Sequence, residues 1–121
     1  MEISNSDRVA IRSVVKRQLL AFQNDDAATA FSFASPGIQA QFRTPEKFMQ
    51  MVKTAYKPVY RPRSVLFEDL TLVDGVLTQP VILLNAEGVP MLAVYLLEKQ
   101  PEGTWRINGC YLVPTEREVS E

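Results

Sequence analysis

Two apolar segments separated by a short turn constrain this chain more than any other feature. Met91–Leu97 and Trp105–Val113 carry the valine, tyrosine, tryptophan, isoleucine and leucine residues that fit a pleated, buried surface. The linking segment Glu98–Thr104 holds a Pro-Glu-Gly sequence, in which proline pre-sets one φ angle and glycine tolerates the positive φ that follows. The stretch Pro90–Pro114 therefore predicts a long β-hairpin.

The first of these segments is apolar on both faces, whereas an antiparallel strand with one solvated face should alternate apolar and polar residues. Helices can cover one face, and a second copy of the chain is the simplest cover for the other. The sequence therefore predicts a homodimer packed sheet to sheet. Curvature of the sheet within a single copy is the alternative. In the second segment, strict alternation places on one face Trp105, Ile107, Gly109, Tyr111 and Val113.

Three helices are predicted before the sheet. Ser6 is expected to cap the first, whose apolar residues recur at three- and four-residue spacing until the helix ends near Asn24. The second follows two aspartates and runs through Ala34. The third has Thr44 as its N-cap and proline at its first position, while Ile38–Phe42 offers one more turn.

Gln18 interrupts the apolar side of the first predicted helix. We expect a boundary residue with a solvated amide, and the alternative is a polar group that faces a pocket.

The remaining strands precede the hairpin. Two prolines in Lys57–Arg63 predict an extended connector, because each proline disfavours helix in the residue before it. The apolar residues of Ser64–Val73 switch parity near Glu68, which indicates a bulge or a bend. After an Asp-Gly turn, Val76–Ala86 is the next strand, in which Pro80 requires an edge or a bulge. Helices followed by at least four mostly antiparallel strands predict an α+β fold with the helices on one face of the sheet.

Composition limits the chemistry available to the chain. The 121 residues predict one domain over 1–121, with a core at about 6–114 and a flexible tail over 115–121. A net charge of −1 argues against nucleic-acid binding and against binding to anionic membranes. The chain has no histidine and a single cysteine, Cys110, so we expect no metal site and no cofactor. The absence of a signal peptide and of a long apolar run predicts a cytoplasmic protein without membrane contact.

Three stretches, Leu20–Gly37, Thr44–Val65 and Gly103–Leu112, resemble the nuclear transport factor 2-like (cystatin-like cone) superfamily. Within it, Phe31–Pro36 and Pro58–Pro62 look like an uncharacterised bacterial family of unknown function. The resemblance spans about residues 8–113. It implies three helices on a strongly curved sheet that forms a cone, a mouth able to hold an apolar ligand, and a dimer. No catalytic motif of the superfamily matches residue for residue, so we assign no catalytic residue.

The expected site is an apolar pocket inside this cone, with a filled core as the alternative. A basic run around Tyr60 adds a candidate contact for an anionic head group, with a solvated connector as its alternative. The residues expected to bind a ligand are Phe31, Phe48, Tyr56, Tyr60, Arg61, Phe67, Gln79, Tyr95 and Cys110.

The expected function is non-catalytic binding of a small apolar or amphipathic molecule by a dimer. One alternative is an enzyme of isomerase, dehydratase or cyclase type, in which a pocket acid such as Asp25, Asp26 or Asp69 works with a tyrosine. The other alternative is a protein–protein interaction module with a closed core.

Overall fold

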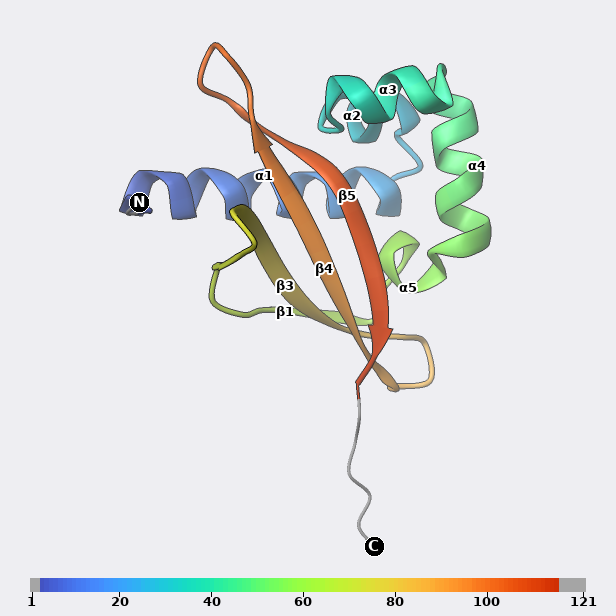
Figure 1. Cartoon of the computed structure of the whole chain (residues 1–121). Helices are drawn as coiled ribbons and strands as arrows, with labels where there is room; N and C mark the ends of the chain where they lie inside the picture. Colours follow the sequence, from blue (N-terminus) through green and yellow to red (C-terminus); the bar gives the residue numbers. More distant parts are fainter. Residues whose placement is uncertain (1–2, 116–121) are drawn as a thin grey trace, which may run out of the picture.

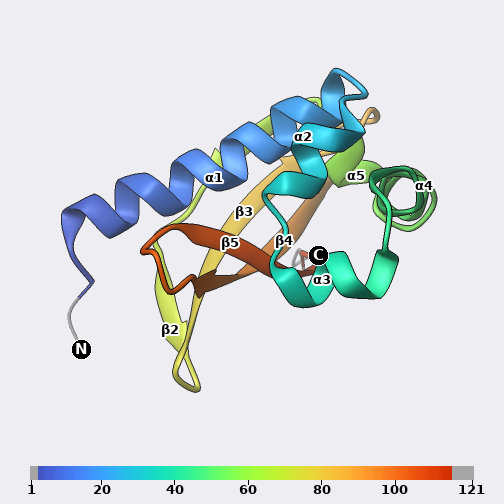
Figure 2. The same cartoon turned by 90° about the horizontal axis from the view of Figure 1, so that it is seen from above.

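The computed structural model describes residues 3–115, in which five helices precede five strands. The helices are α1 (Asn5–Gln23), α2 (Ala27–Ser32), α3 (Pro36–Phe42), α4 (Pro45–Ala55) and α5 (Lys57–Tyr60). The strands are β1 (Ser64–Phe67), β2 (Thr71–Val73), β3 (Val76–Leu84), β4 (Pro90–Lys99) and β5 (Trp105–Pro114). Helix α1 crosses one face of the sheet, and α2 to α4 gather beside β5 (Figures 1 and 2).

The sheet is antiparallel and open. Its order is β1-β3-β4-β5, and β2 also pairs with β3. Because β1 and β5 stand at opposite ends of this order, the sheet does not close into a barrel. The predicted α+β class with an antiparallel sheet is confirmed.

The predicted count of three helices is wrong, because α3 and α5 also form in residues 3–115. Ser35 caps α3, and Pro36 occupies its first turn. Pro58 lies in the first turn of α5, where its missing N–H costs no helical hydrogen bond. The connector Lys57–Arg63 is therefore helical in its first half, which the proline rule alone did not predict.

The structure also differs from the prediction at the start of α1 and at the end of α2. Helix α1 is capped by Ser4 rather than Ser6, and the Ser4 hydroxyl accepts a hydrogen bond of 3.0 Å from the Asp7 amide. Helix α2 ends at Ser32 instead of continuing through Ala34, because the next residues join β5. The Ile107 amide donates to the Phe33 carbonyl at 2.8 Å, which removes Phe33 from the helical pattern.

The predicted parity switch near Glu68 corresponds to the break between β1 and β2. The Glu68 amide donates to the Pro80 carbonyl at 3.0 Å across this break. In an antiparallel strand, the N–H and the C=O of one residue point toward the same neighbouring strand. The N–H that Pro80 lacks would therefore point at the break between β1 and β2, where neither strand needs a donor. Proline is thereby accommodated in a strand that has neighbours on both sides.

The predicted hairpin is confirmed as β4 and β5, but strict alternation in β5 is wrong. Leu96 pairs with Gly109 and Leu97 pairs with Ile107, so Asn108 is an extra residue that forms a β-bulge. Beyond the bulge the faces exchange, and Cys110 joins Ile107 on the face that the helices cover.

Candidate functional site

A cavity of about 580 Å³ lies between the helices and the β4–β5 end of the sheet. None of its lining side chains carries a charge. Three exposed residues mark where the cavity meets solvent: Gln41, Ala55 and Asn108. Tyr111 is also exposed, but it points from β5 to the other face of the sheet. The inner lining of the cavity comes from α1, α3, α4, α5, β4 and β5, and its bulky apolar and aromatic side chains include Phe22, Ile38, Phe42, Phe48, Met51, Tyr56, Val59, Tyr95 and Ile107.

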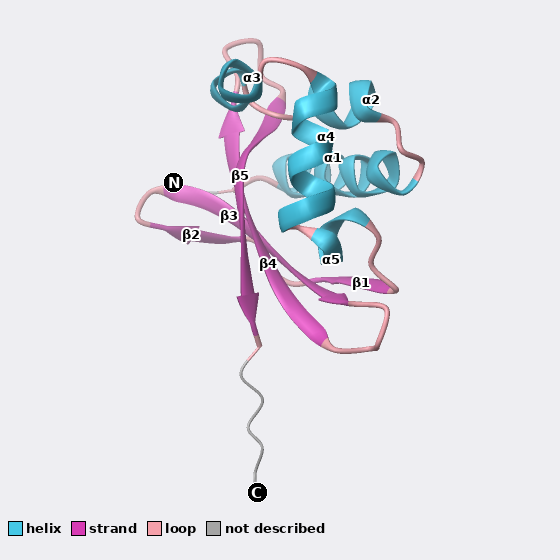
Figure 3. Ribbon diagram, turned by 90° about the vertical axis from the view of Figure 1, so that its right-hand side faces the viewer, coloured by secondary structure: helices cyan, strands magenta, loops and turns pink. Residues whose placement is uncertain are grey.

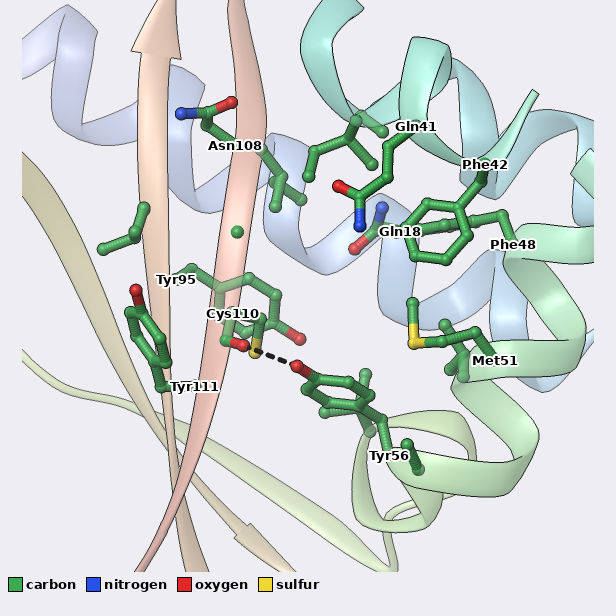
Figure 4. Close-up of a pocket in the computed structure, with 18 of the residues that line it drawn as sticks. Gln18, Gln41, Phe42, Phe48, Met51, Tyr56, Tyr95, Asn108, Cys110 and Tyr111 are labelled. Atoms are coloured by element: carbon green, nitrogen blue, oxygen red, sulfur yellow. Dashed lines mark hydrogen bonds between the residues drawn. The ribbon is translucent and has the colours of Figure 1, made fainter. Parts of the chain in front are cut away.

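Tyr95 is the deepest polar residue of this cavity. It lies on the helix-covered face of β4, between Gln79 of β3 and Cys110 of β5, and only 1% of its surface is exposed. Its hydroxyl is buried and has no well-formed hydrogen bond within residues 3–115; the Cys110 thiol, which is only a weak hydrogen-bonding group, lies beside it. A buried hydroxyl costs about 1–3 kcal/mol when it is left without a partner. Figure 4 shows the ring directed into the cavity.

Burial raises the pKa of Tyr95 well above its ordinary value, and the nearby Cys110 adds to the shift. At neutral pH the hydroxyl is therefore protonated and can donate a hydrogen bond. The residue offers a fixed, neutral donor at the inner end of an apolar space.

Tyr56 and Cys110 form the wall beside Tyr95. The Tyr56 hydroxyl donates to the Cys110 carbonyl at 2.9 Å, shown as the dashed line in Figure 4. Burial raises the pKa of Tyr56, and it raises the pKa of the Cys110 thiol to about 12. Since the thiolate is the reactive form of cysteine, Cys110 is poorly suited to act as a nucleophile.

Gln18 lies on the opposite side of the cavity, where it is 3% exposed. Its Nε2 donates to the Ala30 carbonyl at 3.0 Å. The expectation of a solvated amide is therefore wrong, because α2 packs over this part of α1. Figure 4 shows the carboxamides of Gln18 and Gln41 directed toward the space that Tyr95 faces.

A group of phenylalanines forms the apolar wall. The Phe48 ring centroid lies 6.0 Å from that of Phe22, 5.4 Å from Phe31 and 5.7 Å from Phe42. Phe31 packs behind Phe48 and does not reach the cavity. These ring contacts join α1, α2, α4 and the last residue of α3 into one apolar wall.

The β-bulge shapes one edge of the opening. The Ser35 hydroxyl donates to Asn108 Oδ1 at 2.6 Å and accepts a hydrogen bond of 3.3 Å from the Ile38 amide. Ser35 is fully buried, so one side chain joins the bulge of β5 to the start of α3. Asparagine is unusual within a strand, but the partner of Asn108, Ser35, lies 73 residues away, so the pair could not be identified from the sequence.

Tyr60 and Arg61 belong to a separate cluster around Asp25. Asp25 accepts hydrogen bonds from the Tyr60 hydroxyl and, at 2.9 Å, from Arg61, while Lys53 lies 3.6 Å away. The Tyr60 hydrogen bond, then the two cations, lower the pKa of Asp25. Much of the basic run is thus paired within the chain, outside the cavity.

Of the nine residues expected to bind a ligand, the structure brings four to the cavity: Phe48, Tyr56, Tyr95 and Cys110. Phe67 faces a different groove, and Gln79 is buried with its Nε2 donating to the Glu68 carbonyl at 2.7 Å. The sequence reading missed Ile38 and Phe42. Their spacing of four residues was a usable signal, since it places both on one side of the short helix α3.

Within residues 3–115, no helix combines the length and the apolar character needed to cross a membrane. The same residues contain no group of three or more cysteine, aspartate or glutamate side chains placed to hold a metal ion.

A family model described as "Domain of unknown function (DUF4864)" matches residues 4–120. No curated protein and no solved structure matches the chain.

Proposed function

The chain belongs to the DUF4864 family of domains of unknown function, and we propose that it binds a small, largely apolar and uncharged molecule in the cavity beside Tyr95. The observation that carries this proposal is the buried hydroxyl of Tyr95, which has no partner within residues 3–115. A ligand with one hydrogen-bond acceptor would satisfy this hydroxyl after a shift of the side chains that cover it, and would occupy the apolar space beside it.

The absence of charge in the cavity lining selects among ligands. Burying an ionised group without a partner is costly, and none of the side chains that line the cavity carries a charge. The carboxamide of Gln18 adds a second polar contact opposite Tyr95. A ketone, ester or lactone on a hydrocarbon or aromatic frame fits this arrangement better than a carboxylic acid or an amine does.

The two alternative functions find less support. An isomerase, dehydratase or cyclase of the expected kind needs a carboxyl group in the cavity, and none of the three candidate acids lines it: Asp25, Asp26 and Asp69. A module with a closed core needs no cavity of ligand size, whereas this one measures about 580 Å³.

We further propose that the family is part of the nuclear transport factor 2-like superfamily and that two copies associate through the sheet. Helices followed by an open antiparallel sheet agree with the first point. The apolar face that the helices leave uncovered supports the second. This outer face, as we call it, consists of Ile82, Leu92, Val94, Leu96, Tyr111 and Val113.

A titration with Nile red, an uncharged apolar dye with a carbonyl acceptor, tests the proposed site. We expect saturable fluorescence enhancement with the unmodified protein. Tyr95→Phe keeps the ring and removes the donor, so its Kd should rise roughly fivefold, the equivalent of about 1 kcal/mol for one hydrogen bond. Ala55→Trp should block the opening and abolish saturable binding.

Tyr60→Phe is the matched control, because it removes a tyrosine hydroxyl that lies outside the cavity. Its Kd should equal that of the unmodified protein. Binding of Nile red that is unaffected by both Tyr95→Phe and Ala55→Trp would place the dye elsewhere and refute the proposed site.

A further inference from the structure

A second concave surface lies on the opposite side of α1, between that helix and β1. This groove has a volume of about 840 Å³ and shares no lining residue with the cavity beside Tyr95. Its walls are formed by Val9, Arg12, Ser13, Lys16, Arg17, Leu19, Leu20 and Gln23 of α1 and by Val65, Leu66 and Phe67 of β1. We call it the α1–β1 groove.

The α1–β1 groove is locally basic in a chain whose net charge is −1. Arg12, Lys16 and Arg17 line it, and no acidic residue does. Within residues 3–115 none of these three cations forms an ion pair, whereas Lys53 and Arg61 both pair with Asp25. The Arg12 guanidinium lies 5.0 Å from the centre of the Phe67 ring, which holds one cation in place over the groove.

Apolar side chains are exposed beside these cations. Val9, Leu20 and Leu66 have 63%, 57% and 60% of their surface accessible to solvent. Val9, Lys16 and Leu20 lie on the same side of α1, because residues seven and eleven positions apart return to nearly the same side after two and three turns. Together they form a surface that is both apolar and positively charged.

The strand that borders the groove is an edge strand (Figure 3). Strand β1 pairs only with β3 among the described strands, so the backbone groups on its other side have no strand partner. Three consecutive residues, Val65, Leu66 and Phe67, line the groove although their side chains alternate between the faces of the sheet. The groove therefore follows the free edge of β1.

We infer that the α1–β1 groove docks an acidic, partly apolar polypeptide segment of a partner protein, which adds to the free edge of β1 as an extended strand. Backbone hydrogen bonds to β1 would hold the segment in register. Its carboxylates would face Arg12, Lys16 and Arg17 on α1, and the apolar side chains on its other face would cover Leu66, whose side chain points away from α1. A concave surface with a strand edge at its base suits an extended chain better than it suits the flat surface of a bilayer.

Fluorescence anisotropy with a labelled octapeptide of alternating glutamate and valine tests this inference. We expect saturable binding that weakens as salt is raised. A peptide with lysine in place of glutamate should not bind. A glutamate–valine peptide with every second amide N-methylated on its pairing edge should bind at least tenfold more weakly, because it cannot pair with β1. These comparisons use the unmodified protein alone.

Two protein variants locate the site. Arg12→Glu with Lys16→Glu should weaken binding of the acidic peptide at least tenfold. Lys47→Glu with Lys57→Glu makes the same change of charge outside the groove and should have a much smaller effect. Thermal unfolding of both variants checks that each is folded.

Any of three results would overturn the inference: no binding of the acidic peptide, equal binding of the N-methylated peptide, or equal effects of the two double variants. Vesicles of phosphatidylserine and phosphatidylcholine provide the last comparison. Binding to these vesicles without binding to the acidic peptide would assign the groove to a membrane surface instead.

Discussion

The Tyr95 hydroxyl is buried among apolar side chains without a hydrogen-bond partner in residues 3–115. A group of this kind lowers the stability of the ligand-free protein, because water satisfies it only in the unfolded chain. Residues that weaken the fold in this way are expected at functional sites, where a ligand supplies the missing partner. Stability and binding should therefore respond to Tyr95 in opposite directions.

Tyr95→Phe should raise the free energy of unfolding of the ligand-free protein by about 1 kcal/mol, because it removes an unsatisfied polar group and keeps the ring. Urea denaturation measures this change. The same variant binds Nile red more weakly if the proposed function holds. A loss of stability of similar size would show that the hydroxyl is already satisfied in the folded protein, and would remove the main support for a ligand at this position.

At the scale of single residues, the sequence indicated which side chains line the cavity better than it indicated which groups they hydrogen-bond to. Tyr95 and Cys110 were expected in a pocket, and both line the cavity. Gln79 was expected there too, but it donates to the Glu68 carbonyl. The difference depends on the break between β1 and β2, which exposes a carbonyl group to Gln79. No pattern within β3 carries that information.

Ser35 connects two elements that are distant in the sequence. Its hydroxyl caps α3 and donates to Asn108 in the bulge of β5, so it joins the helical side of the cavity opening to the strand side. The flanking backbone strengthens this connection, since the Ser35 amide donates to the Ile107 carbonyl at 2.8 Å. We expect the shape of the opening to depend on Ser35.

Ser35→Ala should lower the free energy of unfolding by about 2 kcal/mol, since it removes a helix cap and leaves Asn108 without its partner. It should also weaken Nile red binding, because the bulge is no longer held against α3. Thr44→Ala is the matched control: Thr44 caps α4 by accepting from the Lys47 amide at 3.1 Å, and it does not line the cavity.

The control should lose only about 1 kcal/mol, the usual value of a cap, with an unchanged Kd for Nile red. If Ser35→Ala and Thr44→Ala reduce stability and binding to the same extent, Ser35 is a cap and nothing more. Urea denaturation and the dye titration separate these outcomes.

Some elements defined by local signals, such as α4, were predicted correctly, whereas features defined by distant contacts were not. Thr44 and Pro45 begin α4 as the sequence indicated, because capping is a local property. Helix α2 ends early because β5 removes Phe33 from it, and β5 is more than 70 residues away. The bulge at Asn108 likewise depends on residues outside β5, because it is defined by the pairing with β4 and by the hydrogen bond from Ser35.

At the scale of the whole molecule, the helices found in residues 3–115 leave one face of the sheet uncovered. On the covered face, Ala93, Tyr95 and Leu97 of β4 are buried, whereas Leu92, Val94 and Leu96 on the outer face remain partly exposed. The sequence predicted that β4 would be apolar on both faces and the structure agrees.

We expect native mass spectrometry of protein purified without denaturation to report a dimer, since a second copy would bury the outer face of each chain. Leu92 lies on that face, between Ile82 of β3 and Val113 of β5. Leu92→Lys should give a monomer that remains folded, because the lysine stem can cover the neighbouring side chains while the ammonium group reaches water.

Val89→Lys is the matched control, because Val89 is equally apolar but lies in the turn that precedes β4. It should remain a dimer. A monomeric unmodified protein would refute the dimer, and a Leu92→Lys protein that still forms dimers would place the interface elsewhere. Extra non-protein mass on the native protein that is absent from Ala55→Trp would connect the two proposals, since the same spectrum reports the assembly and the ligand that accompanies it.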